Sequence, residues 1–428
     1  MQSHDRRDRL IVQSTDSLEG VIDISGAKNS VLKIMAATLL AEGEYKLHNV
    51  PRITDVDLMI ELLCAVGCEV AWADTSPATL IITVPADINP VAPYEIVEKF
   101  RASIVLLGPM LGRCGEARVA LPGGDDFGPR PIDMHLHGLK QMGAHIKVVH
   151  GNIEAATKGL FGVRTTLDFP SVGATENLLM AAVAAEGVTV IDNAAREPEI
   201  SDLCKFLTAM GASINGVGSS TLEIQGTTAQ HRALQATDHT VIPDRVEVAT
   251  YLIALGITRG DLTITRARYG HIMLLVQKLS DMGMRIRSDG DSIRATSVGR
   301  LKSVDCATLP YPGLATDYKP FLVALLATAS GVSIVTENLF AGRFRYIDEL
   351  RRMGADIHTD SHHAVVRGVD RLSGAPVKAH DIRAGAALAV AGLGAKGTTM
   401  ISDAHHIARG YEDIVGKLCG VGARISSD

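Results

Sequence analysis

Short polar motifs punctuated by glycine or proline recur along the chain, and all but one contain arginine or lysine. A guanidinium group forms paired hydrogen bonds with phosphate and with carboxylate, so arginines that converge from several loops would bind a small ligand with several negative charges. A single loop arginine is ordinarily a solvated surface charge, and the argument therefore depends on the recurrence. The motifs are ISGAKNS (24–30), FRASIVLLGP (100–109), LPGGDDFGPRPIDMH (121–135), LDFPSVGATEN (167–177), AAREPEI (194–200), PDRVE (243–247), TDYKP (316–320), GRFRY (342–346), DIRAG (381–385) and HHIARGYE (405–412).

Neither disulfide nor metal chemistry is indicated by the cysteines and histidines. The cysteines are scattered and most lie beside apolar helix residues, so we expect free structural thiols. The histidine pairs at 362–363 and 405–406 lack cysteine or carboxylate neighbours at ligand spacing, so we expect no metal site. The cysteines are Cys64, Cys68, Cys114, Cys204, Cys306 and Cys419.

Two series of glycines divide the chain into units of about 70 residues. In the first series a helical segment ends in glycine and a strand begins one residue later, as in LTAMGASI and LRRMGADI. In the second series glycine closes an apolar stretch and opens a strand, as in GVTVID. Two independent markers with one period predict a six-fold internal repeat. The first series is Gly67, Gly143, Gly211, Gly283, Gly354 and Gly422, and the second is Gly43, Gly115, Gly187, Gly260, Gly331 and Gly397.

Each repeat has the same order of expected elements. The segment VLKIMAATLLAEG is apolar nearly all round, which predicts a buried helix. The segment ITDVDLMIELLCAVG is apolar on one side, which predicts a helix at a surface or against a sheet. EYKLHNV and CEVAWA predict strands, so each repeat should wrap strands around a buried helix.

The length predicts more than one domain. A single core stops growing near ~250 to 300 residues, and the chain has 428. Six repeats divide into two groups of three, separated by the polar stretch near residues 230–240. We predict an N-terminal domain of residues 20–236 and a C-terminal domain of residues 1–19 plus 237–428, completed by the N-terminal strand LIVQS. Two chain crossings suit a hinge, and a cleft between the domains is the expected ligand site.

The amino-acid composition limits the classes of molecule that the protein could bind. Hydrophobic residues make up 46% of the chain and charged residues 21%, and the net charge is only −6. This describes an ordinary globular protein without the basic stripe that nucleic acid requires. No uninterrupted apolar run approaches the ~18 residues of a membrane span, and the N-terminus lacks the apolar core of a signal peptide. We therefore expect a cytoplasmic protein without nucleic-acid or membrane partners.

The motifs, in this order and across essentially the whole chain, resemble those of the enolpyruvyl transferase family. The resemblance implies an α/β fold, the two-domain inside-out α/β barrel, with six repeats of about 70 residues, buried helices and sheets outside. It implies transfer of the enolpyruvyl group of phosphoenolpyruvate to a hydroxyl of a uridine nucleotide, with release of phosphate and without metal or organic cofactor. UDP-N-acetylglucosamine, in peptidoglycan precursor synthesis, is the favoured acceptor, and UMP, in nucleoside-antibiotic biosynthesis, is the alternative.

The resemblance also implies roles for individual residues. Phosphoenolpyruvate phosphate would be held by Lys28, Arg130 and Arg409, and its carboxylate would lie near Arg343 and Arg383. Asn29 and Asp317 would contact the acceptor sugar, with Asp317 as the base and Asp125 as the proton donor to C3. The uridine diphosphate site would be lined by Arg101, Arg130, Pro131, Asp133, Met134, Ser171, Val172 and Gly173.

The chain departs from the family pattern near these positions. Many members carry Cys where this chain has Asp125, and a carboxylate is a far weaker nucleophile than a thiolate, so we expect insensitivity to the epoxide fosfomycin. Lys319 replaces a Gln-type residue and would suit a terminal phosphate monoester, which favours UMP. Further departures are Phe127, Leu314-Ala315, Ala341-Gly342 and Ala408.

Two other interpretations stay open at this point. A shikimate-pathway transferase is less favoured, because the lid and uridine-site motifs point elsewhere. A catalytically silent paralogue that only binds nucleotide is opposed by the presence of Lys28, Asp125, Asp317 and the arginine set.

Overall fold

The computed structural model describes residues 8–74, 76–123, 131–227, 233–340 and 342–428. These residues form two compact units, an N-terminal unit of residues 26–123 and 131–242, and a C-terminal unit of residues 8–25 and 243–428. Each unit has its own hydrophobic core. Within the described part of the chain, no helix combines the length and apolar character needed to cross a bilayer.

The N-terminal unit has three four-stranded sheets among its described residues, each with one parallel and two antiparallel pairings. In pairing order, the strands are β14 (His239–Thr240), β3 (Gly43–His48), β5 (Leu80–Val84) and β4 (Glu69–Trp72); β6 (Val91–Ala92), β7 (Glu116–Ala120), β9 (Asn152–Ala156) and β8 (His145–Val149); and β10 (Arg164–Thr166), β11 (Val188–Asp192), β13 (Thr221–Gln225) and β12 (Ser213–Asn215).

The helices of the N-terminal unit are of two kinds. Inner helices are buried along most of their length: α1 (Lys28–Ala37) continuing into η1 (Thr38–Leu40), η2 (Arg101–Leu106) continuing into α4 (Leu107–Cys114), and α6 (Val172–Val183). The remaining helices are exposed along one side: α2 (Thr54–Ala65), α3 (Tyr94–Val97), α5 (Asp133–Gln141) and α7 (Pro198–Ala209).

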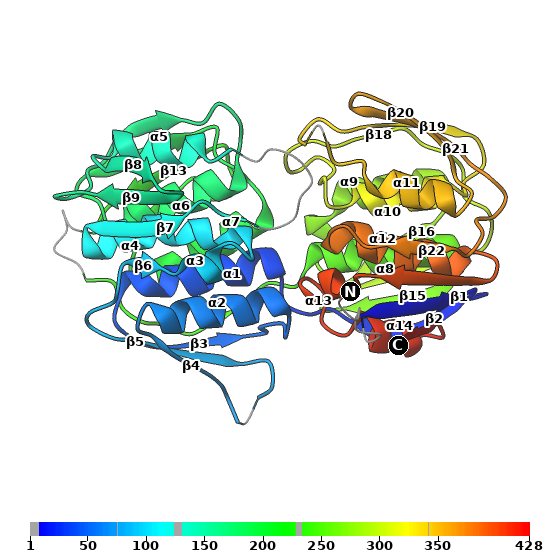
Figure 1. The fold of residues 1–428 in the computed structure, drawn as a ribbon, viewed down its shortest axis with the longest axis horizontal. Coiled ribbons are helices and arrows are strands. Elements are labelled where there is room, and N and C mark those ends of the chain that lie inside the picture. Colours follow the sequence, from blue (N-terminus) through cyan, green and yellow to red (C-terminus); the bar gives the residue numbers. More distant parts are fainter. Residues whose placement is uncertain (1–7, 75, 124–130, 228–232, 341) are drawn as a thin grey trace. The chain divides into compact units, whose positions relative to one another are not determined.

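The described residues of the C-terminal unit repeat this arrangement with three further four-stranded sheets (Figure 1). In pairing order, their strands are β16 (Arg285–Asp289), β17 (Ser292–Ser297), β15 (Gly260–Thr265) and β2 (Leu18–Asp23); β18 (Cys306–Ala307), β19 (Val332–Thr336), β21 (His363–Arg367) and β20 (Asp356–Asp360); and β22 (Pro376–Lys378), β23 (Thr398–Ser402), β1 (Arg9–Gln13) and β24 (Arg424–Ser427).

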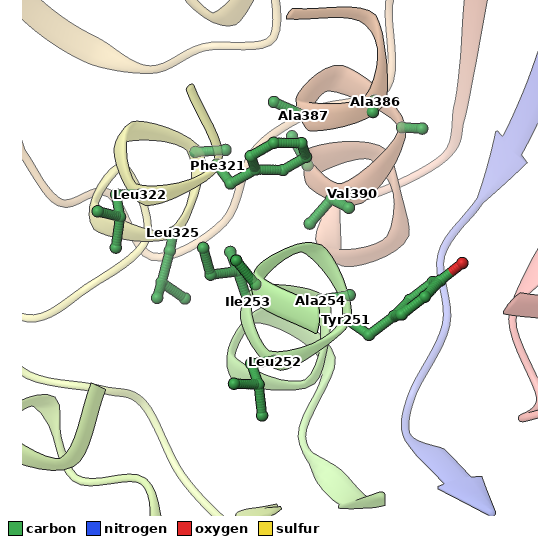
Figure 2. Close-up of a cluster of buried hydrophobic side chains, with 14 of the residues drawn as sticks. Tyr251, Leu252, Ile253, Ala254, Phe321, Leu322, Leu325, Ala386, Ala387 and Val390 are labelled. Carbon is green, nitrogen blue, oxygen red and sulfur yellow. The ribbon is translucent and has the colours of Figure 1, made fainter. Parts of the chain in front are cut away.

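Three inner helices pack against one another in the middle of the C-terminal unit: α8 (Arg245–Thr258), α10 (Lys319–Leu326) and α12 (Ile382–Gly394). Figure 2 shows their contact, with Phe321 of α10 beside Ala387 and Val390 of α12 and the side chains of α8 below. Every residue of α8 except Ile257 is buried, including Arg245 and Glu247 in the first turn, and the rest of the helix is mainly apolar on every side, as a buried helix requires. The other helices are η4 (Tyr269–His271), α9 (Met273–Met282), α11 (Tyr346–Arg352), α13 (His405–Ala408) and α14 (Ile414–Cys419).

The glycine series marks backbone positions that other residues adopt at a cost. In the first series, from Gly67 to Gly422, φ lies between +90° and +117°, and in the second it lies between +71° and +128°. Glycine reaches these angles without steric penalty, so it ends a helix and turns the chain into the next strand. The repeated glycines thus have a repeated structural cause.

Each unit contains the strand that precedes the first inner helix of the other unit. The strand before α1 is β2, which pairs in parallel with β15, and the strand before α8 is β14, which pairs in parallel with β3. The division of the chain therefore falls after residue 25 and after residue 242, whereas the sequence placed it after 19 and after 236. The N-terminal strand β1 pairs with β23 and β24 in the C-terminal unit, as expected. Three repeats per unit, with helices inside and sheets outside, confirm the predicted fold class.

Candidate active site

Asp317 lies between two arginines in the C-terminal unit. Its Oδ1 accepts a hydrogen bond from Arg343 Nη1 at 2.8 Å, and its Oδ2 is 3.5 Å from Arg383 Nε. Both guanidinium groups are buried, with side chains 4% and 5% exposed, whereas the Asp317 side chain is 24% exposed. Two of the arginines that the sequence singled out therefore meet at the carboxylate of Asp317, which a ligand can still reach.

The charge of this carboxylate is set by the arginines. Burial by itself raises the pKa of Asp317, but Arg343 and Arg383 outweigh burial and hold that pKa well below its usual range. Opposite charges within contact distance favour the ionised form. Asp317 is therefore ionised at neutral pH.

The N-termini of α8, α10 and α12 surround this group. Asp244 caps α8 and Asp381 caps α12, each through its side-chain oxygen and two backbone N–H groups. Arg245, at the start of α8, donates to the hydroxyl of Tyr318 at 3.2 Å, just before α10. Because helix N-termini carry partial positive charge, their convergence favours a bound anion.

Arg383 retains unused donor capacity at this point. Its guanidinium lies 5.2 Å from the ring centroid of Tyr411, whose hydroxyl is 2.7 Å from Thr250 Oγ1. Among the described residues, buried Nη1 of Arg383 has no hydrogen-bond partner. A buried guanidinium N–H is nearly always satisfied, so this atom is suited to an anionic group of a ligand.

Lys319 does not lie where the sequence interpretation requires. Its side chain is fully buried, and Nζ is 2.8 Å from Glu337 Oε2 and donates to the carbonyl of Arg343 at 2.6 Å. The ammonium group is thus neutralised inside the unit. This corrects the expectation that Lys319 offers a cation to a terminal phosphate, and it removes that argument for UMP.

In the N-terminal unit, Lys28 forms a buried ion pair at the start of α1. Its Nζ is 2.7 Å from Asp55 Oδ2, and the two side chains are 11% and 4% exposed. Asn29 follows in the same helix, half-buried, and its carbonyl accepts a hydrogen bond from Lys33 Nζ at 2.8 Å. The helix N-terminus adds to the positive potential at Lys28.

The residues expected at the uridine site come from three helix starts of the same unit. Arg101, the first residue of η2, donates through Nη2 to the carbonyl of Pro131 at 3.4 Å. Ser171 caps α6 by accepting from Ala174 N, and Val172 and Gly173 begin that helix. The first two residues of α5 are exposed Asp133 and half-buried Met134.

A buried histidine and asparagine connect these helix starts. His135 Nδ1 is 2.9 Å from Asn177 Nδ2, and Asn177 also bonds the backbone of Ile104 and Gly108. Burial, reinforced by Arg101, lowers the pKa of His135 to about 4, so the ring is neutral and accepts from the amide. A Cβ built on Gly173 would lie 3.1 Å from the His135 ring, so a larger residue there would require the ring to shift by a few tenths of an ångström.

The remaining expected residues are placed only in part. Asp125 and Arg130 lie outside the described residues, as do Phe127 and Ala341. Arg409 is half-buried and directly follows α13, a helix that contacts α12. Ala408 is exposed at the end of α13.

Several residues of this site were not assigned roles from the sequence. Asp244 and Arg245 fall in the motif PDRVE, Asp381 begins DIRAG, and Asn177 ends the motif at 167–177, so a signal was present. Asp55 and Glu337 lie outside every motif, and only the folded chain brings them to their lysine partners.

The structure also places the cysteine thiols and the side chains that could bind a metal. The six cysteines are free, with Cys68, Cys204 and Cys306 buried. No group of three or more potential metal-ligating side chains occurs among the residues that the structure describes.

Comparison with known proteins places the chain in a family. The family model described as EPSP synthase (3-phosphoshikimate 1-carboxyvinyltransferase) matches residues 12–418. The chain belongs to the EPSP synthase family. A family member from Nocardia farcinica named UDP-N-acetylglucosamine 1-carboxyvinyltransferase is 50% identical over 421 residues, 98% of each chain. A member of the same name from Mycobacterium tuberculosis is 49% identical over 418 residues, again 98% of each chain.

Solved structures of family members agree with the fold. The enolpyruvyl transferase NikO from Streptomyces tendae has a TM-score of 0.88 and 25% sequence identity, covering 98% of each chain. An EPSP synthase from Acinetobacter baumannii, at 18% identity and a TM-score of 0.74, shows likeness of fold alone. The enolpyruvyl transferase resemblance is therefore confirmed for this chain.

Proposed function

We propose that this chain transfers the enolpyruvyl group of phosphoenolpyruvate to the 3-hydroxyl of UDP-N-acetylglucosamine and releases phosphate. The choice of acceptor rests on the sequence identity to two relatives that are named for this activity. The identity is 49 to 50% over 98% of each chain. Because Lys319 is neutralised by Glu337, it does not supply the cation that would favour transfer to UMP. The reaction would supply peptidoglycan precursors in the cytoplasm.

We assign each residue to a substrate group according to its charge. Phosphoenolpyruvate is a trianion or dianion, and its phosphate is assigned to Lys28, Arg130 and Arg409, with its carboxylate assigned to Arg343 and Arg383. Asn29 orients the acceptor sugar. The uridine diphosphate is assigned to the residues named above on η2, α5 and α6, where Arg101 supplies a positive charge and the α6 N-terminus adds the partial positive charge of a helix start.

Chemistry requires a base at the acceptor hydroxyl and an acid at C3. The hydroxyl oxygen attacks C2 as its proton passes to Asp317, and C3 takes a proton from Asp125; phosphate then leaves with a proton lost from C3. A carboxylate held by two arginines is ionised but weakly basic. When the substrate carboxylate draws hydrogen bonds from Arg343 and Arg383, the pKa of Asp317 rises, so the base strengthens only in the complex.

A direct assay separates the acceptors. Phosphate release from phosphoenolpyruvate is measured with UDP-N-acetylglucosamine, UMP and shikimate 3-phosphate, and product masses are recorded. We expect kcat/KM at least tenfold higher for UDP-N-acetylglucosamine than for UMP, because binding energy from the remote sugar and second phosphate supports the chemical step. A preference for UMP would assign the chain to the alternative reaction, and no turnover with any acceptor would refute an enzymatic role.

A further inference from the structure

We propose that the buried Lys319–Glu337 pair is a positioning device that holds Arg343 and Asp317 in register for phosphoenolpyruvate, an inference that rests on the proposed function. Lys319 begins α10, and Glu337 directly follows β19. Both side chains are completely buried, and Nζ lies 2.8 Å from Oε2. The pair therefore joins an inner helix to the end of a strand beneath the site.

Glu337 accepts hydrogen bonds at both oxygens. Oε1 accepts from Thr308 Oγ1 at 2.7 Å and from the backbone N–H groups of Leu339 and Phe340 at 2.8 and 3.1 Å. Oε2 accepts from Thr316 Oγ1 at 2.8 Å in addition to Lys319. The carboxylate thus fixes the start of the segment that leads to Arg343 and the residue before Asp317.

Lys319 fixes the other end of that segment. Its ammonium donates to the Arg343 carbonyl at 2.6 Å and lies 3.9 Å from the ring centroid of Phe344. Arg343 in turn donates through Nη1 to Thr316 Oγ1 at 3.1 Å and to Asp317 Oδ1 at 2.8 Å. The Thr316 hydroxyl therefore accepts from the arginine while it donates to Glu337, which closes a ring of contacts through both members of the pair.

The protonation of Lys319 depends on the charged groups around it and on its burial. Glu337 and Asp381 favour the charged form of Lys319, whereas burial and Arg343 disfavour it, and Tyr346 faces the ammonium with its ring 6.0 Å away. Burial has the largest effect and lowers the pKa of Lys319 to about 8. Above that pH the ammonium loses its proton and Glu337 loses its counter-ion, so the arrangement of Arg343 weakens at alkaline pH.

A double-mutant cycle tests the proposal with the full-length protein. Lys319→Gln and Glu337→Gln each leave one buried partner uncompensated, and we expect each to lower kcat/KM for phosphoenolpyruvate at least tenfold. The double variant replaces the ion pair with two amides, and we expect it to recover to within about threefold of wild type. The KM for UDP-N-acetylglucosamine should stay within about twofold throughout, because the uridine residues belong to the other unit.

The pH profile provides a readout that a merely structural role would not move. Wild type should lose kcat/KM along an alkaline limb near pH 8, and the double variant should lack that limb. Lys378→Gln, which breaks an exposed ion pair with Asp403, serves as the matched control and should behave as wild type.

Three outcomes would overturn the proposal. A Lys319→Gln variant with an increased KM for the nucleotide, not rescued by Glu337→Gln, would place Lys319 at the substrate. Single variants with wild-type activity would remove the positioning role. An unchanged alkaline limb in the double variant would do the same. Wild-type inactivity with every acceptor would instead refute the proposed function, so the two failures are distinguishable.

Discussion

Glu176 provides a quantitative test of the core of the N-terminal unit. It lies within α6 with 1% of its surface exposed, and Lys33 Nζ, which carries the opposite charge, is 3.5 Å from Oε1, longer than a good hydrogen bond. Burial raises the pKa of Glu176 from 4.5 to about 7, Lys33 opposes this rise, and Glu199 and Glu197 add to it. The charged form is therefore poorly compensated.

The sign of the effect follows from proton linkage. The folded protein holds this proton more tightly than the unfolded chain, so the free energy of unfolding falls as pH rises from 4.5 to about 7. The full difference corresponds to about 3 kcal/mol, most of which is lost between pH 5 and pH 8. A glutamine at this position does not titrate and avoids that loss.

The assay is thermal unfolding of wild type and Glu176→Gln at pH 5 and pH 8. For a unit of this size, a loss of about 2 to 3 kcal/mol corresponds to roughly 5 to 10 °C in Tm. We expect the variant to gain that much relative to wild type on going from pH 5 to pH 8, whatever its Tm at pH 5. Glu186→Gln, which changes an exposed carboxylate of the same unit, is the control. A Tm difference between wild type and Glu176→Gln that is equal at the two pH values would refute the reasoning.

Three further predictions concern the proposed site. Arg409→Ala should weaken phosphoenolpyruvate binding by roughly 2 to 5 kcal/mol, the range for removing one partner of a buried charge pair, while chelators leave wild type unaffected; full activity in the variant contradicts the assignment. Lys28→Gln removes the ion pair with buried Asp55 and should destabilise the fold by about 3 to 5 kcal/mol. The double variant Lys28→Gln/Asp55→Asn should restore Tm but not turnover, and a recovered kcat in the double variant would contradict the role of Lys28. Fosfomycin should form no covalent adduct with wild type, and Asp125→Asn should be nearly inactive. Asp125→Cys should turn over and become sensitive to the drug. Intact-mass spectrometry tests this, and an adduct within residues 121–130 of wild type would contradict the assignment of Asp125.

The repeat and the class of each helix could be read from the sequence because both depend on local patterns. A glycine with positive φ is required wherever a helix turns into a strand, and it therefore recurs at a regular interval. After its first turn, the buried helix α8 is mainly apolar on all sides, whereas α9 buries Leu275, Val276, Leu279 and Met282 on one side, and each pattern is visible along the chain. The arginine loops were visible for the same reason, since each motif is a short contiguous segment.

Only the tertiary structure decided which partner each charge meets. The sequence suggested that Lys319 is a cation that contacts the substrate, but Glu337 neutralises it inside the unit. Lys28 is paired with Asp55 from another helix. The pairing of β2 with β15 and of β14 with β3 likewise moved both boundaries, because strand edges pair in space and their sequences carry no mark of the partner. The reason is physical: backbone turns and amphipathic faces are properties of neighbouring residues, whereas burial of a charge and the pairing of a strand edge depend on groups brought together from distant parts of the chain.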